Sequence, residues 1–478
     1  MTENSNKLTF AGVDWPVIFI YLALVLIGWL NIYAAVYDEA HANIFDISQR
    51  YGMQLVWMGI SFFLAVSVLL IDAKYYHILA YPLYWITIVI LLGVFVFGKE
   101  VNGARSWYEF GPVRIQPTEF VKFTASLAVA RAMSSYNFNI HRFSSVATVF
   151  FILAIPVGII MLQNDTGSAL VYGAFFFMLF REGFNGWLYV ALFMLVTLFV
   201  FSFWLEPVPL LLLMLLVCIA GEGALNGRWK QKIVYFAGVL LGALGLYFLF
   251  RVLGGEISFY AGLVISSLLS LVVVLIYAFR HRLRNVYLFV LLFVGSLCFT
   301  NTIDYVFDNV LQIHQQKRIL DLLGLESDLK NWGYNVNQSK IAIGSGGFSG
   351  KGFLEGTQTK YDFVPEQSTD FIFCTVGEEW GFLGSAAVVI LFGALILKLI
   401  AMGERQQETF GRIYCYSVAS ILFFHFIVNI GMTVGLMPVI GIPLPFFSYG
   451  GSSLIAFTVL LFVAVKLDSS KKEHIRRI

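Results

Sequence analysis

The sequence has little charge and few cysteines. Asp, Glu, Lys and Arg make up 13% of its 478 residues, against 59% hydrophobic residues, and a soluble protein carries roughly twice that charge. The cysteines lie scattered in apolar stretches without a CxxC pair, which argues against disulfides and a zinc site. They are Cys218, Cys298, Cys374 and Cys415.

The chain also lacks the patterns of several enzyme classes. No two histidines lie at metal-ligand spacing, and no Ser/His/Asp or Cys/His arrangement indicates nucleophilic catalysis. The glycine-rich stretch 337–352 does not have the GxxxxGK[ST] spacing of a nucleotide-binding loop. No cleavable signal peptide is evident, because a polar start leads into a run long enough to span a membrane.

What the sequence does contain is a series of apolar runs, with a mean hydropathy of +0.80 for the chain. Most are near the ~20 residues that cross the hydrocarbon core as a helix. We therefore predict an all-α, polytopic membrane protein with about fourteen transmembrane helices. The predicted spans are 15–36, 52–71, 77–97, 118–134, 145–162, 167–181, 187–204, 208–220, 231–250, 257–278, 285–303, 371–398, 413–436 and 450–466.

The distribution of charge predicts the orientation of these spans. With the N-terminus in the cytoplasm, the loops assigned to the inside carry Lys or Arg, as the positive-inside rule requires. The first outside loop holds Asp38, Glu39 and Asp46 against only Arg50. We therefore expect both termini in the cytoplasm and the long segments 98–117 and 304–369 outside.

The outer segment before the fourth span concentrates charge. Pro117 and Glu119 indicate a helix start, and Glu119 and Lys122 share one face of that helix. One interpretation is an interfacial ion pair that fixes the helix end. The other is a cationic pocket of Arg105, Arg114 and Lys122 for a lipid pyrophosphate, since ionisable groups at membrane depth are costly and usually functional.

Two further polar stretches have competing interpretations. Asp165 is either the N-cap of the next helix or part of a site. The glycine-rich stretch is either a flexible loop or a backbone cradle for an anion. Segment 304–369, which contains it, keeps enough apolar and aromatic side chains to predict an ordered, functional region.

Carboxylates gather around the twelfth predicted span. Asp370 precedes it, and partial burial there would raise its pKa toward that of a useful general base; the alternative is a helix cap, for which Thr369 competes. Glu378 and Glu379 lie within the span and should face the bundle interior or a wet cavity. Between the last two spans, the prolines and glycines of 437–453 forbid a continuous helix.

Seven motifs occur in an order typical of one family. They are RSW (105–107), QPTE (116–119), QNDTGSA (163–169), NQSKIAIGSGGFSGKGFLEGTQ (337–358), VPEQSTDFIF (364–373), GEEWG (377–381) and GIPLPFFSYGGSS (441–453). Together they resemble the shape, elongation, division and sporulation (SEDS) family, which includes RodA, FtsW and SpoVE. The stretch from Gly350 to Gln358 is most like RodA.

The resemblance implies a ten-helix core with about four inserted helices. On it we divide the chain into the N-terminal part of the core (1–186), inserted helices (187–303), an extracytoplasmic catalytic loop (304–369) and the C-terminal part with a basic tail (370–478). It also implies an inner-membrane peptidoglycan glycosyltransferase that polymerises lipid II into β-1,4-linked glycan during cell elongation. The implied partners are undecaprenyl-pyrophosphate-linked glycan, a class B penicillin-binding protein and other elongation-complex membrane proteins, with no nucleic acid.

Residue by residue, Asp370 matches the family's essential aspartate and is the expected general base. Two departures are Ser368, where a histidine is common, and Asn164, where a proline is common. A divalent cation, Mg²⁺ or Mn²⁺, is compatible with this chemistry, but the sequence shows no dedicated site for it. The expected substrate-binding residues are Arg105, Trp107, Arg114, Gln116, Glu119, Lys122, Asp165, Arg318, Ser339, Lys340, Lys351 and Glu378.

Two other functions remain open on the residues alone. Polar side chains inside spans (Glu378, Glu379 and Asn429) and broken helices also suit a lipid II flippase or another lipid transporter. A noncatalytic scaffold for the penicillin-binding protein is the third possibility. Product analysis would separate the enzyme from the transporter, because only an enzyme makes glycan chains.

Overall fold

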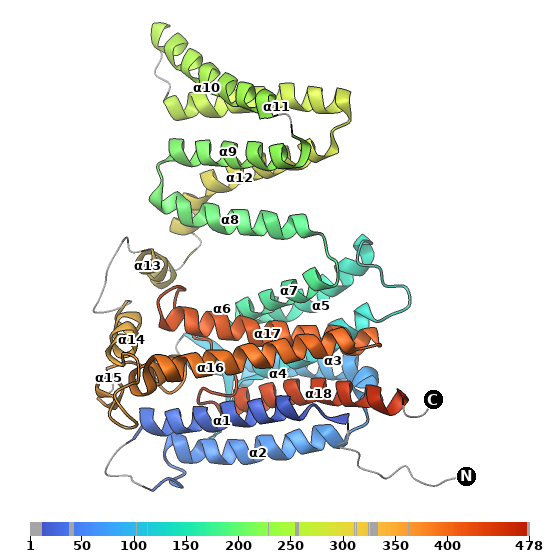
Figure 1. The fold of residues 1–478 in the computed structure, drawn as a ribbon, viewed down its shortest axis with the longest axis vertical. Coiled ribbons are helices and arrows are strands. Elements are labelled where there is room, and N and C mark those ends of the chain that lie inside the picture. Colours follow the sequence, from blue (N-terminus) through green and yellow to red (C-terminus); the bar gives the residue numbers. More distant parts are fainter. Residues whose placement is uncertain are drawn as a thin grey trace. The chain divides into compact units, whose positions relative to one another are not determined.

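Helices make up most of the computed structural model (Figure 1). It describes residues 12–37, 43–101, 103–111, 113–227, 229–253, 258–309, 311, 313–323, 325, 333–361 and 363–475. Two compact units are present, and each has its own hydrophobic core. Unit 1 is Met1–Phe184 with Gly324–Ile478, and unit 2 is Asn185–Leu323.

Unit 1 is a helical bundle built around α4. This helix contacts α3, α5, α17 and α18, and its small residues leave room for these neighbours on several sides. The helices of the unit are α1 (Trp15–Ala35), α2 (Arg50–Leu70), α3 (Ala73–Phe97), α4 (Pro117–Met133), α5 (Phe143–Leu162), α6 (Thr166–Leu170), α7 (Phe175–Arg181), α14 (Tyr334–Ser345), α15 (Thr357–Lys360), α16 (Ile372–Arg405), α17 (Thr409–Thr433) and α18 (Gly451–Ile475).

Unit 2 is a second helical bundle. Its helices are α8 (Gly186–Trp204), α9 (Pro207–Asn226), α10 (Trp229–Val252), α11 (Phe259–His281), α12 (Arg284–Asn309) and α13 (Ile313–Leu322). The core consists of aliphatic and aromatic side chains such as Leu211, Met214 and Phe293. The units divide at 184/185 and 323/324, whereas our sequence divisions at 186/187 and 303/304 stay predictions.

The predicted fold class is confirmed. Within the described residues, twelve helices are long and apolar enough to cross a membrane. The other two predicted spans, 118–134 and 167–181, also form helices. Of these, α4 carries Glu119, Lys122 and Arg131, and the second is split into α6 and α7 by a 3-10 turn at Val171–Ala174.

Ion pairs join several helix ends of unit 1. Arg405 at the end of α16 pairs with Asp14, before α1, and with Asp468 near the end of α18. Arg412 at the start of α17 pairs with Glu182, after α7. These helix ends therefore lie at one end of the unit, and all were assigned to the same side of the membrane from the sequence.

Segment 98–117, which we predicted to lie outside, contains a short sheet that we did not predict. Strands β1 (Lys99–Val101), β2 (Ala104–Phe110) and β3 (Val113–Ile115) pair antiparallel in the order β1-β2-β3, with Glu109 opposite Arg114. Strands β1 and β3 have only three residues each, too few for an alternating pattern, and β2 (ARSWYEF) does not alternate strictly between apolar and polar residues. Strand β3 contacts α18.

Candidate functional site

The backbone at Asp370, just before α16, is fixed by α17. The buried Asn429 donates from Nδ2 to the Asp370 carbonyl oxygen at 2.9 Å and to the Ile442 carbonyl oxygen at 2.7 Å. One amide thus ties the segment that carries the aspartate to the proline-rich segment after α17. Gly441 lies against the carboxyl group, since a Cβ there would stand 3.5 Å from Asp370 Oδ2.

The two residues before Asp370 are held by the same proline-rich segment. Ser448 Oγ donates to the Thr369 carbonyl oxygen at 2.6 Å, and the Tyr449 amide donates to the Ser368 carbonyl oxygen at 2.9 Å. The helix-breaking residues of 437–453 therefore leave polar groups free to bind another loop. These hydrogen bonds pair backbone groups that are not paired within a helix.

Asp370 is half-buried. Within the described part of the chain, no hydrogen bond or ion pair engages its carboxyl group. Loss of water around it, together with the negative charge of Glu366, raises the pKa of Asp370 to about 7. A carboxylate with this pKa and no protein partner is suited to accept a proton near neutral pH.

Two exposed arginines lie around Tyr449. Arg50 Nη1 donates to Ser368 Oγ at 2.6 Å, and its guanidinium stands 5.8 Å from the centre of the Tyr449 ring. Burial raises the pKa of the Tyr449 hydroxyl, and the charges of Arg50 and Arg114 partly offset that rise. Arg114, on β3, also pairs with Glu109 at 3.2 Å. Arg50 is also 3.9 Å from Glu366, so positive charge lies near the segment that leads to Asp370 and acidic neighbours partly offset it.

A second network lies inside the bundle. Lys122 Nζ is 2.9 Å from Glu119 Oε1, and Lys122 and Glu119 are both buried. The ammonium is also 3.0 Å from His425 Nε2, while His425 Nδ1 is 3.1 Å from the Pro443 carbonyl oxygen. The only proton arrangement that satisfies both contacts of a neutral ring places the hydrogen on Nδ1, so that Nε2 accepts from Lys122.

His425 and Asn429 lie one turn apart on α17 and bind consecutive carbonyls, those of Pro443 and Ile442. The buried pair on α4 is therefore connected to the backbone of Asp370 through α17. Lys122 is almost inaccessible, so it acts on the backbone at Asp370 indirectly, through its contact with His425.

Gln116 and Asp165 meet at the start of α6. The carboxylate of Asp165 accepts from the Ser168 amide at 3.0 Å, as an N-cap does, and from Gln116 Nε2 at 3.1 Å. Asp165 is therefore the N-cap of α6, and it also contacts Gln116, another residue that we predicted for the site. On β2, Arg105 donates through Nε to the Gly98 carbonyl oxygen, and Trp107 is half-buried.

Glu378 is saturated with donors, unlike Asp370. Its carboxylate is completely buried and pairs with Lys351 Nζ at 2.7 Å. It also accepts from the Gln358 amide at 2.9 Å and from the Thr359 amide and hydroxyl at 3.0 Å each. Glu378 therefore fastens the stretch after the glycine-rich segment onto α16, and Lys351 is engaged in that clamp.

The glycines form a seam of close backbone contact. A Cβ at Gly346 would stand 2.0 Å from the Gly377 carbonyl oxygen, and one at Gly350 equally close to that of Glu379. The Lys351 amide donates to the Glu378 carbonyl oxygen at 3.0 Å, beside the break in α16 at Gly381 (φ 62°). The glycine-rich segment is thus packed against α16 rather than loose. The Lys351 amide is hydrogen-bonded to α16.

Three other predicted residues lie along the 304–369 region. Ser339 is buried in α14 and donates to the Thr433 carbonyl oxygen at 2.9 Å. Lys340 is exposed next to Gly435. Arg318 belongs to α13, but its side chain lies outside the described residues. Within those residues, no three His, Cys, Asp or Glu side chains cluster as metal ligands.

The profile of the FtsW/RodA/SpoVE cell cycle proteins matches residues 14–217 and 236–473. The chain belongs to this family. It is 32% identical over 451 residues to the peptidoglycan glycosyltransferase RodA of Treponema pallidum, covering 92% of this chain and 94% of the relative. It is 30% identical to the peptidoglycan glycosyltransferase MrdB of Escherichia coli, covering 99% and 98%.

A solved chain from a peptidoglycan synthase complex shares the fold of this FtsW/RodA/SpoVE protein. The TM-score is 0.59 at 24% identity, over 96% of this chain and 98% of the other. The family profile also runs through most of unit 2, leaving out 218–235. That residues 187–303 are an insertion therefore stays a prediction.

Two contributors to this family member's site were missed in the sequence. Arg50 entered only as a charge in a loop, and His425 was not singled out. His425 and Asn429 are polar residues four positions apart in an otherwise apolar span, which predicts a shared helix face. Arg50 offered no such signal, because Ser368 is 318 positions away.

Proposed function

We propose that this chain is a peptidoglycan glycosyltransferase that polymerises lipid II, with Asp370 as its general base. The named relatives, RodA and MrdB, are peptidoglycan glycosyltransferases that match nearly the whole chain. The observation that carries the assignment of the base is the state of Asp370. Its backbone is held by α17 and the proline-rich segment, while its carboxylate has no partner among the described residues and a pKa of about 7.

In the proposed reaction, the donor is a growing glycan on undecaprenyl pyrophosphate and the acceptor is the GlcNAc 4-hydroxyl of lipid II. Asp370 takes the hydroxyl proton as the oxygen attacks C1 of the donor. The new C1–O bond forms as the bond from C1 to the pyrophosphate oxygen breaks, and the lipid pyrophosphate leaves with the electron pair. Attack from the opposite face inverts the anomeric centre and gives a β-1,4 linkage.

Cations near the leaving group would stabilise the charge that develops on the pyrophosphate. We propose Arg50, Arg114 and Arg105 for this role, because all three are exposed and two of them lie around Tyr449. Lys122 and Lys351 are held by buried carboxylates, so we assign them to positioning. A divalent cation remains compatible with the reaction, and no step of this proposal requires one.

We further propose that the protein spans the bacterial inner membrane with both termini in the cytoplasm and Asp370 on the outer side. The positive-inside distribution of Lys and Arg supports this orientation. The ion pairs of Arg405 and Arg412 gather predicted cytoplasmic helix ends together. We propose a class B penicillin-binding protein as partner and a role in cell elongation, supported by the likeness to a synthase complex and to RodA and MrdB.

The test uses purified full-length protein, labelled lipid II and gel separation of the products, with and without a divalent cation and the penicillin-binding protein. A ladder of glycan chains from the wild type, lost in Asp370→Asn, is the expected result. Wild type that makes no ladder under any of these conditions would favour the transporter or the scaffold.

A further inference from the structure

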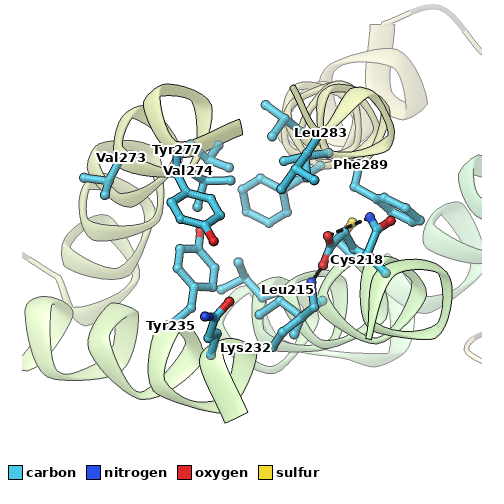
Figure 2. Close-up of a pocket in the computed structure, with 17 residues that line it drawn as sticks. Leu215, Cys218, Lys232, Tyr235, Val273, Val274, Tyr277, Leu283 and Phe289 are labelled. Atoms are coloured by element: carbon cyan, nitrogen blue, oxygen red, sulfur yellow. Dashed lines mark hydrogen bonds and ion pairs between the residues drawn. The ribbon is translucent and has the colours of Figure 1, made fainter. Parts of the chain in front are cut away.

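Unit 2 contains a cavity that the proposed reaction does not use. It measures about 550 Å³ and lies between α9, α10, α11 and α12 (Figure 2). Most of its wall is apolar, from side chains such as Leu215, Leu271, Val290 and Phe293. This volume is typical of pockets that hold small molecules, and such pockets commonly form between the helices of a bundle.

Polar groups are confined to one end of the cavity. Glu222 and Lys232 form an ion pair there, with only 13% and 15% of their side chains exposed. Asn226 Nδ2 donates to Glu222 Oε1 at 2.9 Å. In Figure 2, Tyr235 and Tyr277 lie beside one another at the cavity. A polar ligand group at this end would find both donors and acceptors, whereas the rest of the wall offers neither.

The same end of the bundle is strongly basic. It is formed where α9 and α11 end and where α10 and α12 begin. Lys230, Arg280, Arg282 and Arg284 are exposed there. Between positions 207 and 255 the only acidic residue is Glu222, which Lys232 neutralises, and 257–303 contains none. The rim therefore carries several unopposed positive charges, which attract an anion.

We propose that this cavity binds an anionic phospholipid, with an acyl chain between the helices and its phosphate at the basic rim. Long apolar helices surround the cavity, so bilayer lipid has direct access to it. Basic pockets between transmembrane helices bind anionic headgroups in this way. A neutral or zwitterionic lipid would fill the apolar part without using the charge of the rim.

The test is native mass spectrometry of the full-length protein in neutral detergent, titrated with phosphatidylglycerol or with phosphatidylcholine of the same acyl chains. Val274→Trp places a bulky side chain in the cavity and obstructs it, and Val272→Trp is the control on an exposed face of α11 outside it. Arg280→Gln with Arg284→Gln lowers the charge of the rim at exposed positions, where misfolding is not expected. Arg251→Gln, near the end of α10, is its control.

We expect the wild type to retain phosphatidylglycerol at least tenfold more tightly than phosphatidylcholine. The rim double variant should lose about 25-fold in affinity for phosphatidylglycerol, roughly fivefold per charge, while Arg251→Gln does not. Val274→Trp should abolish retention of the lipid, and Val272→Trp should not. Equal binding of the two lipids by the wild type, or a rim double variant that binds like Arg251→Gln, would overturn the proposal.

Discussion

The two units bury polar groups in different ways. Unit 1 encloses ionisable and amide side chains, among them Glu119, Lys122, Glu378, His425 and Asn429. Among the described residues of unit 2, the buried polar side chains are serines, and its one enclosed ion pair lies at the polar end of a cavity. Because a buried polar group is costly unless it is paired, the difference indicates that precise geometry is needed in unit 1 and apolar packing in unit 2.

The largest expected effect comes from the carboxylate that unit 1 leaves without a partner. Asp370→Asn keeps the size of the side chain but removes the base, so we expect polymerisation to fall by about 10²–10⁴-fold. Labelled lipid II and gel electrophoresis measure it. Glu404→Gln, in an exposed ion pair at the far end of α16, is the control and should stay near wild type. Asp370→Asn within tenfold of wild type would refute the general base.

The second prediction compares the completely buried Glu378 of unit 1 with the partly exposed Glu222 of unit 2. Glu378→Ala removes the acceptor of Lys351 and of several backbone and hydroxyl donors. We expect it to lower the free energy of unfolding by about 3–5 kcal/mol. Glu222→Ala in unit 2 removes the partner of one lysine and one asparagine near solvent, so a smaller loss is expected. Thermal unfolding in detergent measures both, and an equal loss would remove the distinction between the units.

The third prediction tests the link between α4 and the site. His425→Leu removes the contacts to Lys122 and to the Pro443 carbonyl oxygen, which should shift the segment that holds Asp370. Misplacement of about 1 Å can cost roughly 10²-fold in rate. We expect such a loss in lipid II polymerisation, with partial recovery in His425→Gln. His281→Leu, exposed in unit 2, is the matched control. Full activity in His425→Leu would show that the network does not position the base.

The smallest expected effect concerns pH. Asp370 must be ionised to act as a base, so activity should rise with pH and reach half its maximum near 7. Glu366→Gln removes the negative charge that helps raise this pKa. The acid limb should therefore move to lower pH, by less than about one unit because Glu366 is half exposed and solvent screens it. A shift to higher pH would contradict the assignment of the titrating group.

The sequence predicted the helices well because most of them are long apolar runs. It singled out Asp370 because this residue lies at the edge of one, and the role of Asp370 stays a prediction. It did not predict the sheet of 98–117, because two of its strands have three residues each and the third does not alternate strictly. Nor did it show that Arg50 contacts Ser368 or that His425 supports Pro443. Such contacts depend on which helices become neighbours, and packing of the whole bundle decides that.

The glycine seam between 346–350 and 377–381 has a consequence for genetics. Every missense change at a glycine codon adds at least a Cβ, and at Gly346, Gly350 and Gly381 that atom would collide with backbone at 2.0 to 2.3 Å. Loss-of-function alleles that still produce full-length protein should therefore accumulate at these codons, although a glycine has no side chain to take part in the chemistry. A map of such alleles would record where two backbones touch.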